Sequence, residues 1–432
     1  MTLKETNRSA WFWVPSLYFT EGLPYVIVMT VSVIMYKRME ISNTDIALYT
    51  SWLYLPWVIK PLWSPFVDII RTKRFWIISM QLLIGLALIG IALTTQLPFF
   101  FTATLFFFWI VAFASATHDI AADGFYMLGL DQHDQAWFVG VRSTFYRIAM
   151  ITGSGLLIIF AGQMETFTDN IKLAWSITFL LLAVILVLSF LYHKFILPFP
   201  DPDTGKILID FWNVLKEFTD VFVDFFKKDR IILIIAFLLF YRFAEAQLVK
   251  LASPFLLDSM EVGGLALSTS QVGFIYGTVG LILLSVGGIL GGFLAAKQGL
   301  KFWLYPMAVA MNLPNVVYVY LSYIQPQQFW IVNTCVAIEQ FGYGFGFTAY
   351  MLFMILVSEG KHKTAHFAIT TGFMALGMMI PGMFSGLIQE EIGYQYFFIW
   401  VLIATIPGFL LLPFLPIDKN FGKKQQKKIN YK

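Results

Sequence analysis

Long apolar runs constrain the fold of this chain more than any other feature of its sequence. Twelve mostly apolar segments alternate with short breaks that carry charged and turn-forming residues. A helix needs about 20 apolar residues to cross the ~30 Å hydrocarbon core of a bilayer, and each segment reaches that length. The predicted spans are approximately 11–36, 44–69, 75–96, 99–127, 137–163, 172–197, 231–257, 268–296, 301–323, 327–357, 364–389 and 394–415.

The composition excludes most classes of soluble protein. Of the 432 residues, 58% are hydrophobic and 13% are charged, whereas soluble domains carry about 25% charge. A cytosolic enzyme, a disordered scaffold and a nucleic-acid binder are therefore excluded. The single Cys335 rules out an intramolecular disulfide. Without a readable nucleophile elbow, Walker motif, dinucleotide fingerprint or metal spacing, we expect no enzyme, no cofactor, no metal and no direct use of ATP.

The positive charges predict how the chain lies in the membrane. With the N-terminus in the cytoplasm, 21 Lys and Arg residues fall in cytoplasmic segments and three fall outside, namely Lys37, Arg38 and Lys172. Cytoplasmic loops carry the excess of Lys and Arg in membrane proteins. We therefore expect a multi-pass membrane protein with both termini in the cytoplasm.

The spans divide into two groups of six with similar length. Arg74-Phe75-Trp76 in the first group is echoed by Lys301-Phe302-Trp303 in the second. A parallel repeat of this kind builds a transporter around a central cavity. The sequence therefore predicts an all-α membrane protein with a 6+6 fold. We expect an N-terminal bundle at 1–197, a cytoplasmic linker at 198–230, and a C-terminal bundle with a basic cytoplasmic tail at 231–432.

The linker has an amphipathic pattern of its own. Phe211, Leu215, Phe218, Phe222 and Phe225 recur at helical spacing. This pattern predicts a helix on the membrane surface, although a spacer packed on the ends of the bundles would have the same pattern.

Ionisable residues inside the spans are the candidates for function, because charge in lipid costs at least ~2.5 kcal/mol per residue. Asp119 and Asp123 are four residues apart and share one helix face. Two carboxylates held this close cannot both ionise cheaply, so one could carry a proton. The competing interpretation is an ion-pair lock with Lys60, Arg142 or Arg147. The predicted proton-coupling residues are Glu21, Asp119, Asp123 and Glu339.

Other intramembrane charges have different interpretations. Lys60 and Arg147 are candidates for binding an anionic substrate. Arg242 and Glu245 are three residues apart and could form a local pair, or bind substrate together with Gln340. Glu339 could be a second protonation site or a hydrogen-bonded structural group.

Glycine pairs at four-residue spacing predict close helix crossings in the second half. They are Gly273 and Gly277, Gly288 and Gly292, Gly342 and Gly346, and Gly382 and Gly386.

Three stretches of the first half have a distinctive sequence. They are Tyr-Phe-Thr-Glu-Gly-Leu-Pro-Tyr at 18–25, Leu-Pro-Trp-Val-Ile-Lys-Pro-Leu-Trp-Ser-Pro-Phe-Val-Asp at 55–68 and Ser-Ala-Thr-His-Asp-Ile-Ala-Ala-Asp-Gly at 115–124. Together they resemble the AmpG-type muropeptide permeases, in the peptide/acetyl-CoA transporter clade of the major facilitator superfamily, and this resemblance implies a bacterial inner membrane. Asp68, Arg71 and Arg74 also resemble the cytoplasmic loop that latches the inward gate in this superfamily.

The resemblance implies proton-coupled import of cell-wall breakdown products by a monomer. The expected substrates are anhydro-muramyl amino sugars with or without a stem peptide, whose carboxylate would suit Lys60 and Arg147. Aromatic rings expected to stack on the sugar faces are those of Tyr18, Tyr25, Trp57 and Tyr146. The alternatives are a carrier of acetyl-CoA or another anionic metabolite, an efflux carrier for lipophilic compounds, and a membrane sensor without transport activity.

Overall fold

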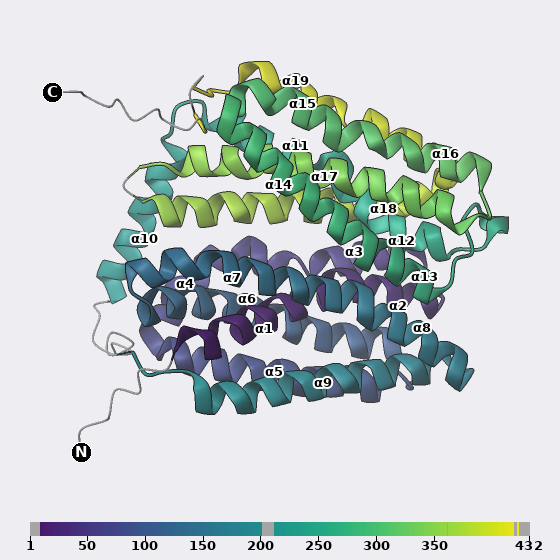
Figure 1. The fold of residues 1–432 in the computed structure, drawn as a ribbon, viewed down its shortest axis with the longest axis horizontal. Helices are drawn as coiled ribbons and strands as arrows, with labels where there is room; N and C mark the ends of the chain where they lie inside the picture. Colours follow the sequence, from purple (N-terminus) through teal and green to yellow (C-terminus); the bar gives the residue numbers. More distant parts are fainter. Residues whose placement is uncertain (1–8, 201–210, 361, 419–420, 423–432) are drawn as a thin grey trace.

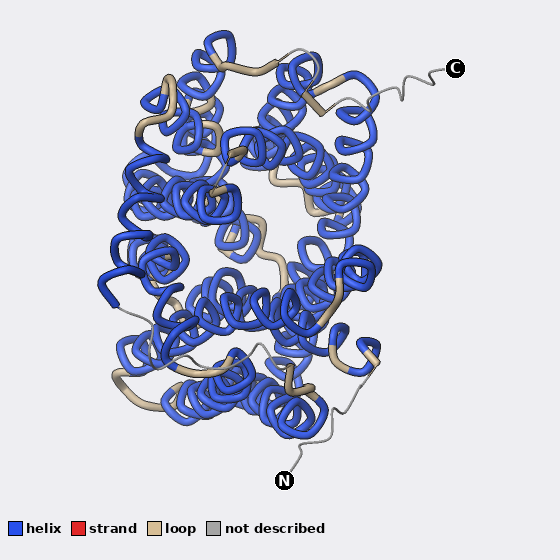
Figure 2. Tube along the Cα trace, turned by 90° about the vertical axis from the view of Figure 1, so that its left-hand side faces the viewer, coloured by secondary structure: helices blue, strands red, loops and turns tan. Residues whose placement is uncertain are grey.

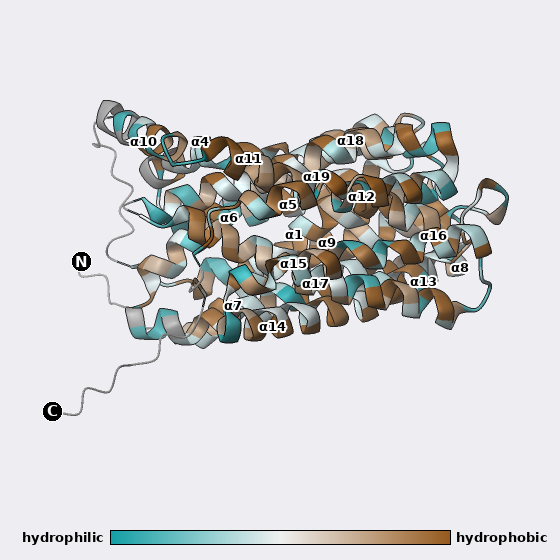
Figure 3. Cartoon of the chain, turned by 90° about the horizontal axis from the view of Figure 1, so that it is seen from above, coloured by the Kyte–Doolittle hydropathy of each residue, from teal (hydrophilic) through white to brown (hydrophobic). Residues whose placement is uncertain are grey.

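In the computed structural model of the protein, helices cross the molecule from end to end (Figure 1). The structure describes residues 9–200, 211–360, 362–418 and 421–422, and within these ranges it contains no strand. Ten continuous helical stretches among these residues are long and apolar enough to cross a membrane. Hydrophobic residues dominate the spans, whereas the loops at both ends are richer in hydrophilic ones (Figure 3).

The first half contains six spans. The first span consists of η1 (Ala10–Phe12), α1 (Val14–Val26), η2 (Ile27–Val31) and α2 (Ser32–Arg38). The second span consists of α3 (Asn43–Trp52) and α4 (Leu55–Ile70). The third and fourth are α5 (Lys73–Thr94) and α6 (Phe100–Gly129). The fifth span consists of α7 (Gln132–Ile151), η3 (Thr152–Leu156) and α8 (Leu157–Thr168), and the sixth span is α9 (Ile171–Ile196).

The second half follows the linker helix α10 (Phe211–Phe226). The seventh span consists of α11 (Ile231–Phe240) and α12 (Phe243–Leu257). After the turn η4 (Met260–Val262), the eighth span consists of α13 (Thr269–Val272), η5 (Gly273–Gly280) and α14 (Leu281–Gln298). The ninth span consists of α15 (Leu300–Asn312), η6 (Leu313–Asn315) and α16 (Val316–Ile324), and the tenth span is α17 (Phe329–Ser358). The last two spans are formed by α18 (Lys363–Ile403), α19 (Ile406–Leu411) and η7 (Leu412–Phe414).

The difference between ten long helices and twelve expected spans has two local causes. The second span is interrupted between α3 and α4, where Pro56 begins the new helix. The last long stretch, Lys363–Phe414, contains two spans, because Gly393 has a φ of 75° that breaks the helix. His366 Nε2 lies 3.3 Å from Val221 O of α10, and Arg230 Nη1 donates to Phe414 O at 3.2 Å, so the chain leaves the linker end and returns to it. With these two corrections the described helices give the twelve expected spans.

Seen from the end that carries α10, the spans form two groups (Figure 2). We call this end the linker end and the opposite one the far end. One close contact between the halves is made by two stretches of π-helix, η3 of the fifth span and η5 of the eighth. A Cβ atom added at Gly277 would lie 2.0 Å from Ser154 O, so only glycine allows this contact.

Gly277→Ala is therefore expected to destabilise the protein. Overpacking of this kind costs about 1–3 kcal/mol, so the thermal unfolding midpoint in detergent should fall by several degrees. Gly292→Ala is the matched control, because Gly292 has nothing within 4 Å of an added Cβ. Equal unfolding midpoints for the two variants would contradict the close packing of η3 against η5.

The linker helix α10 packs on α18 of the second half. Phe225 is fully buried and stacks on Phe373 of α18, with 6.2 Å between the ring centroids. Phe222 lies with Phe226 in an apolar groove between α10, α4 and α18. The side chains of Phe211, Leu215 and Phe218 lie outside the described residues. Contact of α10 with the membrane surface stays a prediction.

Candidate functional site

A polar pocket of about 360 Å³ opens in the first half of the chain. It lies toward the linker end, since Tyr18 is near the start of α1 and Asp123 is near the end of α6. Its lining comes from α1, α6 and α7 and consists of Tyr18, Glu21, Asp119, Asp123, Arg142, Ser143, Tyr146 and Arg147.

Both aspartates of the pocket are paired with cations. Lys60 of α4 forms an ion pair with Asp119. Arg142 Nη2 lies 2.8 Å from Asp123 Oδ1, and Tyr18 Oη donates to the same oxygen at 3.3 Å. In this conformation, therefore, the ion-pair interpretation describes Asp119 and Asp123, and Lys60 and Arg142 are not free to bind an anion.

Two charged groups of the pocket are left without an ionic partner. Glu21 is only 7% exposed and lies beside Asp119, yet its Oε2 atom has no hydrogen-bond partner. Arg147, four residues after Ser143 on α7, is exposed to the pocket. Among the described residues, no hydrogen bond or ion pair to Arg147 is found. The pocket thus presents a carboxyl group that has Asp119 but no cation as a hydrogen-bond partner, and a guanidinium group that has no ion pair among the described residues.

The aromatic residues expected at the site separate into two pairs. Tyr18 and Tyr146 line the pocket. Tyr25 and Trp57 are outside that lining and pack edge to face, with 5.3 Å between their ring centroids. Ser143 is a lining residue that sequence reasoning missed; its position on α7, between Arg142 and Arg147, was the available signal.

The predicted site residues of the second half are not brought to this pocket. Arg242 Nη2 donates to Tyr343 Oη at 2.5 Å rather than to Glu245. Neither carboxylate oxygen of Glu245 has a hydrogen-bond partner, so Arg242 and Glu245 interact electrostatically but form no hydrogen-bonded pair. Gln340 Nε2 donates to Glu339 Oε2 at 2.9 Å, so these two neighbours bind each other.

The predicted gating residues lie at the linker end. Arg74 donates from Nη2 to Lys194 O at 2.5 Å and from Nε to Leu197 O at 3.4 Å, so it connects the third and sixth spans within one half. The Arg71 guanidinium lies over the Phe75 ring, 5.5 Å from its centroid. The side chain of Asp68 lies outside the described residues, and a latch between the two halves stays a prediction.

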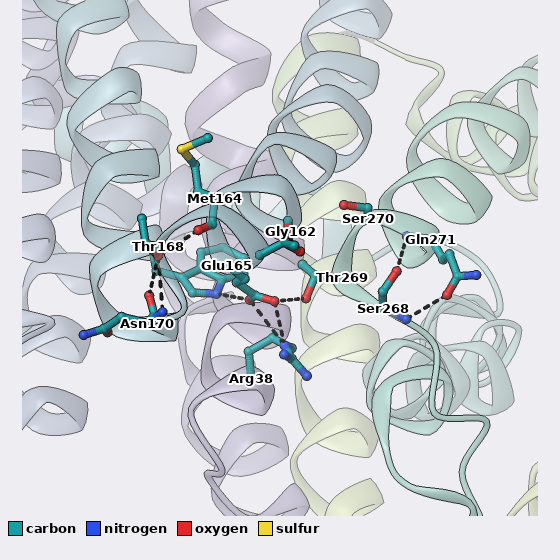
Figure 4. Close-up of polar contacts among 12 residues, drawn as sticks. Arg38, Gly162, Met164, Glu165, Thr168, Asn170, Ser268, Thr269, Ser270 and Gln271 are labelled. Atoms are coloured by element: carbon teal, nitrogen blue, oxygen red, sulfur yellow. Dashed lines mark hydrogen bonds and ion pairs between the residues drawn. The ribbon is translucent and has the colours of Figure 1, made fainter.

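The two halves are joined at the far end through a buried carboxylate, that of Glu165 in α8 (Figure 4). Glu165 accepts from Arg38 Nε at 3.1 Å and from Trp175 Nε1 at 2.9 Å, both in the first half. It also accepts from Thr269 Oγ1 at 2.7 Å, at the start of α13 in the second half. One side chain thus connects the first, fifth, sixth and eighth spans.

Further polar contacts cross between the halves at the same end. Lys37 Nζ lies 2.6 Å from Asp258 Oδ1, and Asn43 Nδ2 donates to Gln389 Oε1 at 2.6 Å. Thr44 Oγ1 donates to Glu390 Oε2 at 2.6 Å. We call these contacts, together with the Glu165 cluster, the far-end seal. The structure is therefore closed at the far end, with its polar pocket nearer to the linker end.

One exposed group has the residue types of a metal site. The ligand atoms of Asp131, His133 and Asp134 lie within 4.8 Å of one another. Asp131 accepts from the backbone nitrogen of Asp134 at 2.8 Å and so caps the N-terminus of α7. We assign these residues to helix capping.

Comparison with known proteins gives the class to which this fold and pocket belong. The model of the Major Facilitator Superfamily matches residues 16–362. The chain belongs to this superfamily, and it is a multi-pass membrane transporter rather than an enzyme. The predicted 6+6 fold is confirmed.

The relatives found among curated proteins narrow the class. "Putative transporter AmpG 4" of Rickettsia conorii is 26% identical over 419 residues, which cover 94% of this chain and 96% of the relative. The "Anhydromuropeptide permease" of Escherichia coli K12 is 24% identical over 410 residues, which cover 92% of this chain and 77% of the relative. The resemblance to AmpG-type permeases is therefore confirmed as homology.

Solved structures share the fold at low sequence identity. A D-xylose-proton symporter superposes with a TM-score of 0.71 at 11% identity, covering 96% of this chain and 99% of its own. The nucleoside transporter NupG superposes with a TM-score of 0.69 at 14% identity, covering 95% and 100%.

Proposed function

We propose that this protein is a proton-coupled importer of anhydromuropeptides, the sugar-peptide fragments of the cell wall, and that it works by alternating access. The observation that carries the proposal is that two groups of opposite charge in the pocket, Glu21 and Arg147, have no ion-pair partner among the described residues. In this proposal Arg147 binds the carboxylate of the substrate and Glu21 carries the proton.

Charge balance links the two binding events. With Lys60 paired to Asp119 and Arg142 to Asp123, the remaining charges of Arg147 and Glu21 cancel. An anionic substrate would add one uncompensated negative charge at membrane depth, where such a charge is costly. Protonation of Glu21 removes that excess. The pocket therefore closes around the anion and the proton together, and this requirement is what couples their transport.

The rest of the pocket suits a sugar with a peptide attached. Tyr18 and Tyr146 offer ring faces, and Ser143 offers a hydroxyl group. A volume of about 360 Å³ lies within the ~300–1,000 Å³ range of ligand pockets. The name of the Escherichia coli relative, anhydromuropeptide permease, supports this class of substrate.

Import follows from the proposed sidedness. The excess of Lys and Arg on one side favours cytoplasmic termini, so the linker end faces the cytoplasm and the far-end seal faces the periplasm. The substrate would enter when that seal opens, and it would leave in the conformation described here.

Uptake of a labelled anhydro-muramyl disaccharide peptide into proteoliposomes tests the proposal. We expect uptake that exceeds equilibrium when the outside is acidic, and that is lost when a protonophore is added. Acetyl-CoA should compete weakly. Uptake of acetyl-CoA without any uptake of the muropeptide would contradict the proposed substrate.

Arg147→Gln is expected to weaken binding of the anionic substrate. A hydrogen bond to a charged group contributes about 1.5–3 kcal/mol, so the KM should rise by about tenfold to a hundredfold. The KM for the same substrate with its carboxylates amidated should change little. Lys301→Gln removes an exposed positive charge outside the pocket and serves as the control. An unchanged KM for the anionic substrate in Arg147→Gln would remove Arg147 from the binding site.

A further inference from the structure

Two buried glutamates in the second half are not used by the pocket. Glu245 lies in α12 and Glu339 in α17, and each is 1% exposed. No ion pair with a described cation is found for either. Charge inside a membrane protein is costly when it has no partner, so these carboxyl groups require an explanation.

Glu339 is surrounded by neutral donors. Its carboxylate accepts from Gln340 Nε2 at 2.9 Å and from Tyr318 Oη at 3.4 Å. Tyr318 in turn forms a hydrogen bond with Tyr276 of η5. These contacts satisfy an ionised carboxylate by hydrogen bonds alone, and they leave its negative charge without a cation.

Glu245 has no such contacts. Both of its oxygens are buried and have no hydrogen-bond partner. The cation nearest in sequence, Arg242, donates to Tyr343 and lies over the Phe347 ring, 4.9 Å from its centroid. Glu245 and Glu339 are close enough to interact electrostatically. Each carboxylate would therefore raise the cost of ionising the other.

The same spans carry acids in both halves, but the cations differ. Glu21 and Asp119 lie in the first and fourth spans, and Glu245 and Glu339 lie in the seventh and tenth, which correspond to them in a parallel repeat. In the first half Lys60 and Arg142 pair with the aspartates. The second half supplies no equivalent pair for its glutamates among the described residues.

We propose that Glu245 is a second proton-binding residue, and that it binds and releases its proton during the transport cycle beside the hydrogen-bonded carboxylate of Glu339. The groups that face this pair are Arg242, Tyr276, Tyr318, Tyr343 and Gln340. Arg242 interacts with Glu245 electrostatically but donates no hydrogen bond to it. A neutral carboxylic acid is far cheaper to bury than a carboxylate without hydrogen bonds, which is why Glu245 rather than Glu339 is the one that holds the proton. The transport part of this inference rests on the proposed function, whereas the binding of a proton by Glu245 does not.

Infrared difference spectroscopy during a pH titration tests proton binding without substrate. The wild-type protein in lipid nanodiscs should show a carboxylic-acid C=O band that is lost in Glu245→Gln. Glu391→Gln, which removes an exposed glutamate, should leave the band in place. A spectrum of Glu245→Gln that equals the wild-type spectrum would overturn the proposal, as would a thermal stabilisation by Na⁺ that Glu245→Gln abolishes.

Accumulation ratios test the role in transport. At a one-unit pH gradient and zero membrane potential, each coupled proton contributes a factor of about ten. Glu245→Gln should therefore lower the accumulation ratio about tenfold, while substrate exchange without a gradient shows that the variant is folded. A wild-type ratio in this variant would overturn the transport role. If the wild type itself ignores the gradient, the proposed function fails, and the infrared result still decides whether Glu245 binds a proton.

Discussion

Replacing Glu21 by glutamine is expected to lower gradient-driven accumulation of the substrate about tenfold for each unit of pH difference, while exchange without a gradient continues. Glutamine keeps the size of the side chain but cannot ionise, so the pocket would accept the anion without a proton. Glu21 is buried in the pocket wall and lies beside Asp119. The measurement is the accumulation ratio in proteoliposomes with an imposed pH gradient.

Two variants make this result specific. Glu261→Gln neutralises an exposed glutamate at the far end and should behave as the wild type. Glu21→Asp keeps the carboxyl group and should retain coupling at a reduced rate. If Glu21→Gln accumulates the substrate to the wild-type ratio, the proton does not travel on Glu21, and one of the salt-bridged aspartates becomes the better candidate.

Covalent closure of the far-end seal is expected to reduce transport to background. Lys37 and Asp258 lie on opposite halves and form an ion pair at 2.6 Å. A lysine and an aspartate side chain joined end to end are longer than the two short arms of a disulfide. The pair Lys37→Cys and Asp258→Cys should therefore be joined with a short, reducible bifunctional thiol reagent. The halves could then no longer separate at this end.

The cross-link experiment needs the background Cys335→Ala, because Cys335 is a free thiol. Each single-cysteine variant, treated in the same way, is the control and should retain transport. Reduction of the cross-link should restore the rate of the double variant. A cross-linked protein that transports at the wild-type rate would show that this end does not open during the cycle.

Much of the fold was predictable because crossing a bilayer imposes a length on each helix. All twelve predicted spans are found, with ends shifted by a few residues. Local breaks were harder to predict. The glycine pair Gly288 and Gly292 shows the limit, since Gly287 and Gly291 make the close contacts to α17 instead. Spacing identified the crossing, but the face of the helix depends on its neighbours.

The site was predictable only where its geometry is local. Helical spacing placed Asp119 and Asp123 together, and the competing interpretation named Lys60, Arg142 and Arg147 as their ion-pair partners. Which of these three cations pairs with which aspartate depends on contacts between helices, and the structure shows Lys60 with Asp119 and Arg142 with Asp123. Local reasoning predicted a pair between Arg242 and Glu245. The two interact electrostatically, but the hydrogen bond of Arg242 goes to Tyr343 of α17, which spacing along α12 could not reveal.

The far-end seal was missed for the same reason. The partners of Glu165 come from spans that are distant in the sequence, and no spacing within one helix reveals them. Pairings between spans depend on how the two halves close, which the sequence of one span does not contain.

The central claim is that the polar pocket opens alternately to the two sides of the membrane. Ser143 lines the pocket and is exposed, so Ser143→Cys in the Cys335→Ala background reports its accessibility to a membrane-impermeant maleimide. We predict that, at rest, Ser143→Cys is labelled from the linker side only. When substrate and a proton gradient are present, it should also be labelled from the far side, and the Lys37–Asp258 cross-link should abolish this labelling from the far side. Labelling from one side only under every condition would contradict the account.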